Sequence, residues 1–362
     1  MSALSRGMMS DDANTLVLSP VNLSAYATHS SVSSPSSLES FSCSDSNSDS
    51  DSQEERRKLA ASSWNDVCTR HGFSIATLPL GRITPELLAR TFDVAKQLFT
   101  LDDDAKMKLR RHNPADNMGY APLGGEAHDT VRGADRKEAF NVRSRRCHTN
   151  DYTGCPPDFQ PVVEEFWDAL EDTARALATC AADAIGVESD FFAKTLKSWE
   201  HCTIRFLHYP ACDFGGDEDS SPIRCGCHTD FGLFTLLFVK DGESGLQLKA
   251  VDGSVEHDDP NLPWRNVQLP ASEDPNGVVM LNTGALLARW TNDAWRATAH
   301  RVVVPSEAQA RQSRYSIAFF VDPDPEMEVA VHEKLGTPKY APILAGEYLR
   351  MRLDEIHLAQ KK

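Results

Sequence analysis

The chain has 362 residues, a formal net charge of −16 and nine cysteines. This acidity argues against nucleic acid or an anionic membrane as a partner, because both would repel a protein of the same charge. No run of residues is long and apolar enough to span a membrane, and the N-terminus lacks the core of a signal peptide. The cysteines are scattered and odd in number, so they do not predict a disulfide framework, and we expect a cytoplasmic protein. The sequence does not set the oligomeric state, and a monomer is consistent with it.

Residues 1–54 are predicted to form a mostly disordered N-terminal segment. Positions 28–53 are rich in Ser with interspersed Asp, and they carry almost no large apolar side chains. Such a stretch cannot bury enough surface to offset the entropy lost on ordering it. A phosphorylated regulatory tail is the alternative, because Ser44, Ser46 and Ser48 stand beside acidic residues; plain solvated disorder is the preferred interpretation.

Residues 55–198 are predicted to be a region of helices with short strands. A helix is expected over 56–70. Thr84 and Pro85 are typical of a helix start, because Thr can cap the first amides and Pro suits the first turn. A long amphipathic helix is expected to begin at Asp158.

From residue 199 to residue 324 the pattern changes to short apolar runs separated by Gly, Pro and Asp. Eight runs are predicted as strands: 202–209, 228–239, 245–250, 264–269, 277–282, 285–290, 299–304 and 314–321. Many short strands with turn signals indicate a jelly roll or barrel, so the chain is predicted to be α+β with a mainly β core flanked by helices. Residues 307–312 are expected to extend a hairpin. Residues 325–362 are predicted to be a helical extension.

Three metal-binding residues stand at an informative spacing: His228, Asp230 and the distant His300. Side chains at positions i and i+2 of a strand share a face, so His228 and Asp230 could reach one metal from one strand. Two imidazoles and one carboxylate form the facial triad that suits non-haem Fe(II) and leaves coordination positions open. Zn²⁺ is the chief rival for the same ligands. We therefore predict a metal centre, with no catalytic side chain beyond it.

Arg314 and Ser316 share one face of a predicted strand by the same rule. A guanidinium binds a carboxylate through two hydrogen bonds, and a hydroxyl can add another. This pair could therefore seat the far carboxylate of an oxygenase co-substrate. Cys225 and Cys227 lie just before His228, and we interpret them as small buried thiols rather than as metal ligands.

These motifs resemble the isopenicillin N synthase-like group of Fe(II)/2-oxoglutarate-dependent dioxygenases. The resemblance covers roughly residues 55–357. Besides the triad and the Arg-x-Ser pair, it is carried by Asn117-Met118-Gly119-Tyr120, Lys137-Glu138-Ala139-Phe140, Arg205-Phe206-Leu207-His208-Tyr209-Pro210, Asn282-Thr283-Gly284, Trp290-Thr291-Asn292-Asp293 and Gly346-Glu347-Tyr348-Leu349. Residues 15–23 resemble the group's short first strand, which would make the Ser-rich stretch a looped-out insertion.

The resemblance implies a double-stranded β-helix of the cupin type that binds Fe(2+) through the triad. It implies that Arg314 forms a salt bridge with 2-oxoglutarate, and that Ser316 and Tyr209 donate hydrogen bonds to it. With O2, such an enzyme would hydroxylate, desaturate or demethylate a small-molecule substrate and release succinate and CO2. Substrate contacts are expected from Tyr120, Phe140 and the C-terminal helix.

Two other functions remain open at this point. Isopenicillin N synthase and the plant ethylene-forming oxidases share the Arg-x-Ser pair but do not consume 2-oxoglutarate. A non-catalytic metal-binding module, with the Ser/Asp-rich segment as its interaction element, is the alternative outside enzymes.

Overall fold

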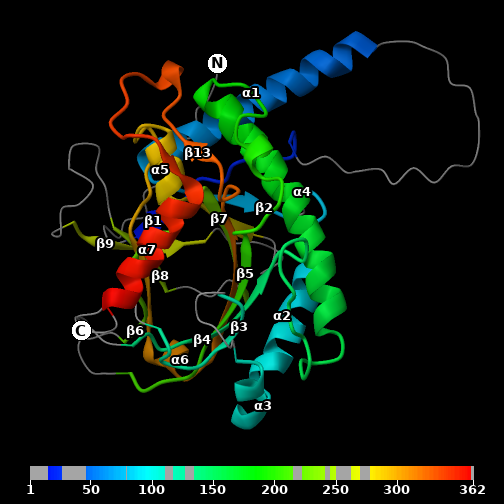
Figure 1. The fold of residues 1–362 in the computed structure, drawn as a ribbon, viewed down its shortest axis with the longest axis vertical. Coiled ribbons are helices and arrows are strands. Elements are labelled where there is room, and N and C mark those ends of the chain that lie inside the picture. Colours follow the sequence, from blue (N-terminus) through cyan, green and yellow to red (C-terminus); the bar gives the residue numbers. More distant parts are fainter. Residues whose placement is uncertain are drawn as a thin grey trace, which may run out of the picture.

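A computed structural model describes residues 15–26, 46–78, 80–110, 117–126, 134–214, 222–240, 245–249, 262–269 and 278–359 (Figure 1). Side chains are described for these residues except 46–51 and 355–359. The helices are α1 (Ser46–Arg70), α2 (Pro85–Phe99), α3 (Asp103–Lys108), α4 (Phe159–Ile185), α5 (Ala285–Trp290), α6 (Glu307–Ala310) and α7 (Ala345–Ala359).

Two sheets packed face to face form the centre of the molecule. The larger sheet has the strand order β2-β10-β7-β12-β5-β4-β3. Its strands are β2 (Phe73–Thr77), β3 (Gly119–Ala121), β4 (Glu138–Arg143), β5 (Thr203–Tyr209), β7 (Phe234–Val239), β10 (Val278–Thr283) and β12 (Arg314–Val321). The smaller sheet has the strand order β1-β9-β8-β11-β6. Its strands are β1 (Thr15–Val17), β6 (Ile223–His228), β8 (Leu246–Lys249), β9 (Trp264–Gln268) and β11 (His300–Val303). Val239 of the larger sheet and Leu248 of the smaller belong to one buried apolar cluster between them. The predicted jelly roll with flanking helices is confirmed.

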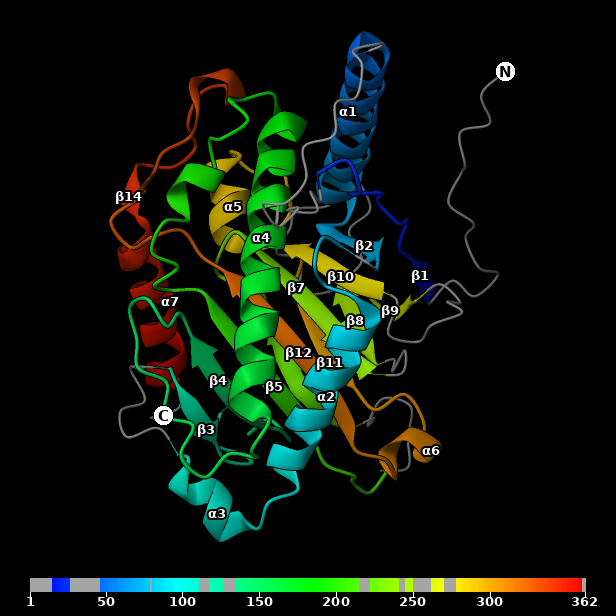
Figure 2. The same ribbon diagram turned by 90° about the vertical axis from the view of Figure 1, so that its right-hand side faces the viewer.

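Helices cover the outer face of the larger sheet. α2 and α4 lie across its strands (Figure 2). Phe166 and Trp167 of α4 pack edge-on against Phe238 and Phe319 of the sheet, with ring centroids 5.5 Å apart in each pair. This aromatic layer leaves the inner face of the sheet to the site described below.

The predicted helix starts at Thr84 and Asp158 are confirmed. The Thr84 hydroxyl accepts a hydrogen bond from Leu87 N at 3.2 Å, which satisfies one of the free amides at the start of α2. α4 begins at Phe159, directly after Asp158, although the Asp158 side chain makes no capping hydrogen bond.

The predicted strand 228–239 is wrong, because it is two strands in different sheets. β6 ends at His228, the chain crosses between the sheets, and β7 begins at Phe234. Periodicity of apolar residues records which side of a strand is buried, but not which sheet the strand joins.

The predicted strand 285–290 is also wrong, because these residues form α5. Ala, Leu and Arg are strong helix formers, and a short apolar run does not separate a strand from a buried helix. The hairpin expected over 307–312 contains the short helix α6 instead. Ser306 begins α6 by accepting a hydrogen bond from Gln309 N at 3.3 Å.

The N-terminal strand is confirmed for Thr15–Val17, where β1 pairs in parallel with β9. α1 begins at Ser46, well before position 56, so the end of the Ser/Asp-rich segment is helical. Acidic side chains are favourable in the first turns of a helix, where the backbone amides carry partial positive charge. Residues 1–14 and 27–45, and with them most of the predicted disorder and the regulatory tail, lie outside the described residues. None of the helices in the described part of the chain has the length and apolarity that a membrane crossing needs.

Candidate metal centre and co-substrate site

Two histidines face each other across neighbouring strands of the smaller sheet. His228 ends β6 and His300 begins β11; they are direct partners in the antiparallel register, with ring centroids 4.3 Å apart. In both rings Nδ1 bonds a backbone carbonyl two residues earlier, Gly226 O at 2.8 Å and Thr298 O at 3.1 Å. A carbonyl can only accept, so Nδ1 carries the proton and each Nε2 lone pair is left for a metal.

Asp230 completes the group from beyond the end of β6, so the expectation that it shares a strand with His228 is wrong. Its Oδ1 lies 3.9 Å from Nε2 of both His228 and His300. Its Oδ2 accepts 2.6 Å hydrogen bonds from Thr235 Oγ1 and Asn282 Nδ2, which turn Oδ1 toward the imidazoles. The three ligand atoms all lie within 4.8 Å of one another, a spacing that leaves room for one ion between them.

The loop that carries Asp230 is held by the start of α5. Ala285 N donates to Asp230 O at 2.8 Å, and the next amide donates to Phe231 O at 2.8 Å. A Cβ on Gly284 would lie 2.2 Å from Gly232 O, so only glycine lets the two segments approach this closely. The unexpected helix therefore supports a metal ligand, which a strand over the same residues would not do.

Burial and hydrogen bonding set the protonation states of the triad. Burial lowers the pKa of His228 and brings the pKa of His300 to about 4. Burial alone would raise the pKa of Asp230, but the two imidazoles and the bonds from Thr235 and Asn282 hold that pKa below its usual value. Neutral imidazoles and an ionised carboxylate are the forms that bind a metal. Two nitrogen donors and one oxygen donor on one side of the ion fit Fe(II).

The predicted carboxylate-binding residues come together on β12 and β5. Arg314 and Tyr209 are direct cross-strand partners, and the guanidinium carbon lies 5.1 Å from the centroid of the Tyr209 ring. Arg314 Nη1 lies 3.3 Å from Ser316 Oγ. All three residues are only 2–3% exposed. A buried cation beside a hydroxyl and an aromatic ring can bind a carboxylate strongly, because water does not compete there.

A small apolar cluster between the sheets lies beside both groups. It contains Tyr209 from β5 and Cys225 from β6. Cys225 Sγ lies 3.9 Å from His228 Nδ1. Cys225 is buried as predicted, but Cys227 is exposed, so the prediction of two buried thiols is wrong for Cys227. Neither cysteine belongs to the group of potential metal ligands found among the described residues.

Tyr120 and Phe140 point away from the inner face, and the expectation that they contact substrate is wrong. The Tyr120 hydroxyl donates to Glu138 beneath the covering helices, and the Phe140 ring packs edge-on against Phe159 with centroids 5.4 Å apart. Strand residues alternate between faces, so their neighbours Ala121 and Ala139 face inward instead. The expected substrate contact from the C-terminal helix α7 stays a prediction. Its Arg352 lies near the metal-binding loop, because the guanidinium carbon is 5.0 Å from the centroid of the Phe231 ring.

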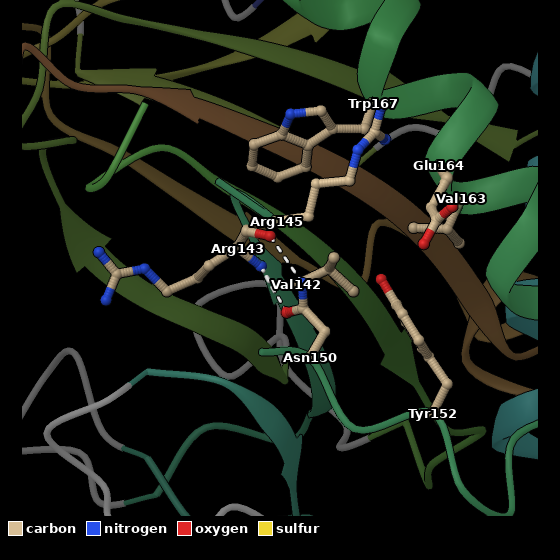
Figure 3. Close-up of a pocket in the computed structure, with 8 residues that line it drawn as sticks. All are labelled: Val142, Arg143, Arg145, Asn150, Tyr152, Val163, Glu164 and Trp167. Carbon is tan, nitrogen blue, oxygen red and sulfur yellow. Dashed lines mark hydrogen bonds between the residues drawn. The ribbon is translucent and has the colours of Figure 1, made fainter. Parts of the chain in front are cut away.

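Figure 3 shows a cavity of about 10 Å³ between β4 and α4, which has room for about one water molecule. Val142 faces this cavity, while the Arg143 guanidinium points away from α4, as strand alternation requires. Tyr26 of the N-terminal segment lines a larger hollow of about 820 Å³, together with Arg57 and other residues of α1 and with residues of α4. Neither hollow is lined by a residue of the triad, so we do not assign the substrate to either.

A jelly roll that carries two His and one Asp at a common point defines the class of non-haem metal-dependent oxygenases. The model of the 2OG-Fe(II) oxygenase superfamily matches residues 199–323, and the model of the N-terminal region of non-haem dioxygenases in morphine synthesis matches residues 42–159. The chain is 30% identical over 277 residues to a 2-oxoglutarate-Fe(II) type oxidoreductase of Aspergillus fumigatus, covering 72% of this chain and 75% of that protein. The chain belongs to the 2OG-Fe(II) oxygenase superfamily, in its isopenicillin N synthase-like branch. It is therefore an Fe(II)- and 2-oxoglutarate-dependent dioxygenase, and the alternative of a non-catalytic module is set aside.

Other relatives agree in fold and class. A proline hydroxylase of Petromyces alliaceus is 29% identical over 259 residues, covering 68% of this chain and 76% of its own. A full-length protein of Neurospora crassa, solved in complex with alpha-KG, superposes with a TM-score of 0.74 at 23% identity, covering 95% of this chain and 98% of that chain. At that identity the structural likeness supports the fold alone.

Proposed function

We propose that His228, Asp230 and His300 bind the Fe(II) and that Arg314, Ser316 and Tyr209 bind the far carboxylate of 2-oxoglutarate. The observation that carries this proposal is that the metal ligands and the carboxylate-binding residues adjoin one apolar cluster between the two sheets, which contains Tyr209 and the Cys225 thiol, 3.9 Å from His228 Nδ1. When bound, Fe(II) and 2-oxoglutarate supply the oxidising chemistry: O2 is consumed, 2-oxoglutarate is converted to succinate and CO2, and the substrate is oxidised.

In this proposal each side chain has one physical task. The carbonyls of Gly226 and Thr298 keep the imidazole protons on Nδ1, so each Nε2 is ready to bind. Thr235 and Asn282 hold the carboxylate of Asp230 in one orientation. Arg314 supplies charge, and the hydroxyls of Ser316 and Tyr209 supply hydrogen bonds, in a place from which water is excluded.

We further propose that the substrate is a small molecule, which the enzyme hydroxylates, desaturates or demethylates. The names of several relatives support this substrate class: proline hydroxylase, homoarginine-6-hydroxylase and validamycin A dioxygenase. These three act on different compounds at 25–29% identity, so they support the class and not one compound.

The first experiment needs no substrate. Metal-free protein is mixed anaerobically with Fe(II) and 2-oxoglutarate, and we expect a weak visible charge-transfer band. His228→Ala should abolish the band, while Cys227→Ser, a change at the exposed neighbour of His228, should leave it unchanged. Intact Fe(II) binding without any band in the natural protein would refute the proposed co-substrate site.

The second experiment addresses the substrate. Metabolite extracts incubated with the natural protein and with His228→Ala are compared, and a compound consumed only by the natural protein is the candidate. We expect one succinate for each molecule oxidised. Oxidation without succinate would instead support an oxidase that does not consume 2-oxoglutarate.

A further inference from the structure

A cluster of four charged side chains, two of them buried and two partly buried, lies beside the metal centre and is used neither by the triad nor by the co-substrate site. Lys137 Nζ lies 2.6 Å from Asp135 Oδ2 and 3.8 Å from Glu126 Oε2, and Glu126 also pairs with Arg205. Asp135 and Lys137 are only 5% and 4% exposed. Burying charge costs several kcal/mol per ion unless it is well paired, so such a cluster is costly if it only fills space.

Hydrogen bonds lead from this cluster to His228 through one residue. Asp135 Oδ1 accepts from Gly226 N at 2.9 Å, and Gly226 O accepts from His228 Nδ1 at 2.8 Å. Lys137 Nζ also lies 3.6 Å from Cys225 Sγ. The side chains of Asp135 and Lys137 thus contact Gly226 and Cys225, two residues of β6 with atoms 2.8 Å and 3.9 Å from His228 Nδ1.

The strand pairing explains why β6 needs this support. His228 pairs with His300, but Cys225 pairs with Val302, so β6 has one residue more than β11 between the two pairs. Such a bulge interrupts the ladder and leaves an amide without its usual partner strand. Gly226 lies in this interval, and its amide donates to Asp135. Asp135 precedes β4 of the larger sheet, so the bond also ties the two sheets together beside the metal centre.

The geometry points to Asp135 and Lys137 as positioning residues that hold the Gly226 backbone and thereby orient His228 for the metal. Asp135 supplies the acceptor, and Lys137 neutralises and fixes Asp135. This inference rests on the proposed role of His228 as a ligand. It extends that role, because groups that orient a ligand alter metal affinity by about 10–100-fold when removed.

A second buried ion pair offers a matched control. Lys106 Nζ lies 3.0 Å from Glu138 Oε2, and these side chains are 10% and 4% exposed. Glu138 follows Lys137 directly, so its side chain points to the opposite face of β4, where it accepts from His208 Nδ1 at 2.6 Å. Breaking this pair should lower the free energy of unfolding without changing the orientation of His228.

The test compares two double variants that both remove the charges. Asp135→Asn/Lys137→Met keeps an oxygen acceptor for Gly226 N, whereas Asp135→Leu/Lys137→Met does not. The metal-free full-length proteins are titrated with Co(II) by calorimetry, alongside Lys106→Met and His228→Ala. We expect the Leu/Met variant to bind Co(II) about 10–100-fold more weakly than the natural protein. The Asn/Met variant and Lys106→Met should stay within about threefold of it, because the Gly226 bond is kept in both.

Equal affinity of the two double variants, whether both normal or both weak, would overturn the inference, since the acceptor would then have no role. If the Leu/Met variant does not fold, the inference is tested instead by the imidazole NMR spectrum of the metal-free Asn/Met variant. The Nδ1–H signal of His228 should persist as in the natural protein, and its loss would overturn the inference. Unchanged Co(II) binding in His228→Ala would instead refute the proposed metal centre, so the two failures are distinguishable.

Discussion

The sharpest prediction concerns Arg314→Met, which removes the charge from the proposed 2-oxoglutarate site while keeping an apolar side chain of similar length. Arg314 is 2% exposed and lies beside the Tyr209 ring and the Ser316 hydroxyl, so water cannot replace it readily. Truncating one partner of a buried, hydrogen-bonded charge pair costs about 2–5 kcal/mol. Since about 1.4 kcal/mol is tenfold, the KM for 2-oxoglutarate should rise by about 30-fold or more.

The assay is succinate formation at increasing 2-oxoglutarate concentration, with Fe(II) saturating. Arg301→Met is the matched control, because Arg301 follows the metal ligand His300 but stacks on Trp264, with its guanidinium carbon 4.2 Å from the ring centroid. This control should leave the KM for 2-oxoglutarate within about threefold of the natural value. A folded Arg314→Met protein with a similarly small change, or a control as impaired as Arg314→Met, would refute the assignment.

Three further predictions test the support of the triad. Thr235→Val removes one of the two bonds that hold Asp230, and Co(II) titration should show a loss of affinity of about tenfold, whereas unchanged affinity would contradict that role. Gly284→Ala places a Cβ 2.2 Å from Gly232 O, and urea unfolding should show a loss of about 1–3 kcal/mol, which an unchanged midpoint would exclude. Burial brings the pKa of His300 to about 4 in the folded metal-free protein, so the unfolded chain takes up a proton first as pH falls. The free energy of unfolding should therefore drop between pH 6.5 and 4, by an amount on the order of 3 kcal/mol, and His300→Gln should flatten that dependence.

Local chemistry made several features predictable from residue order. The start of α2 follows from the capping hydroxyl of Thr84, which acts within one turn of its own position. The triad and the Arg314–Ser316 pair were identifiable because few residue types bind Fe(II) or a carboxylate. The spacing of these residues in the sequence does not give their arrangement in space, however. Asp230 lies on a loop after β6 and not on β6 itself, as the spacing had indicated.

Sequence patterns predicted poorly on which face of a sheet a side chain lies and which residue is its hydrogen-bond partner. Tyr120 and Phe140 look suited to a substrate pocket by residue type, yet one step along a strand reverses the face, and they point into the aromatic layer instead. Asn282 and Thr235, which hold Asp230, lie on two other strands, and only their common position in space gives them that task.

The sequence by itself determined which groups could bind a metal and which could bind a carboxylate, because both kinds of site depend on residue types that can be read directly. Only the tertiary structure decided how those residues are oriented. That orientation depends on contacts between distant segments, such as the amide of Gly226 with Asp135 and the first amides of α5 with the Asp230 loop. Such contacts form because buried polar groups must find partners wherever the fold brings one within reach, and no periodicity along the chain records which partner that is.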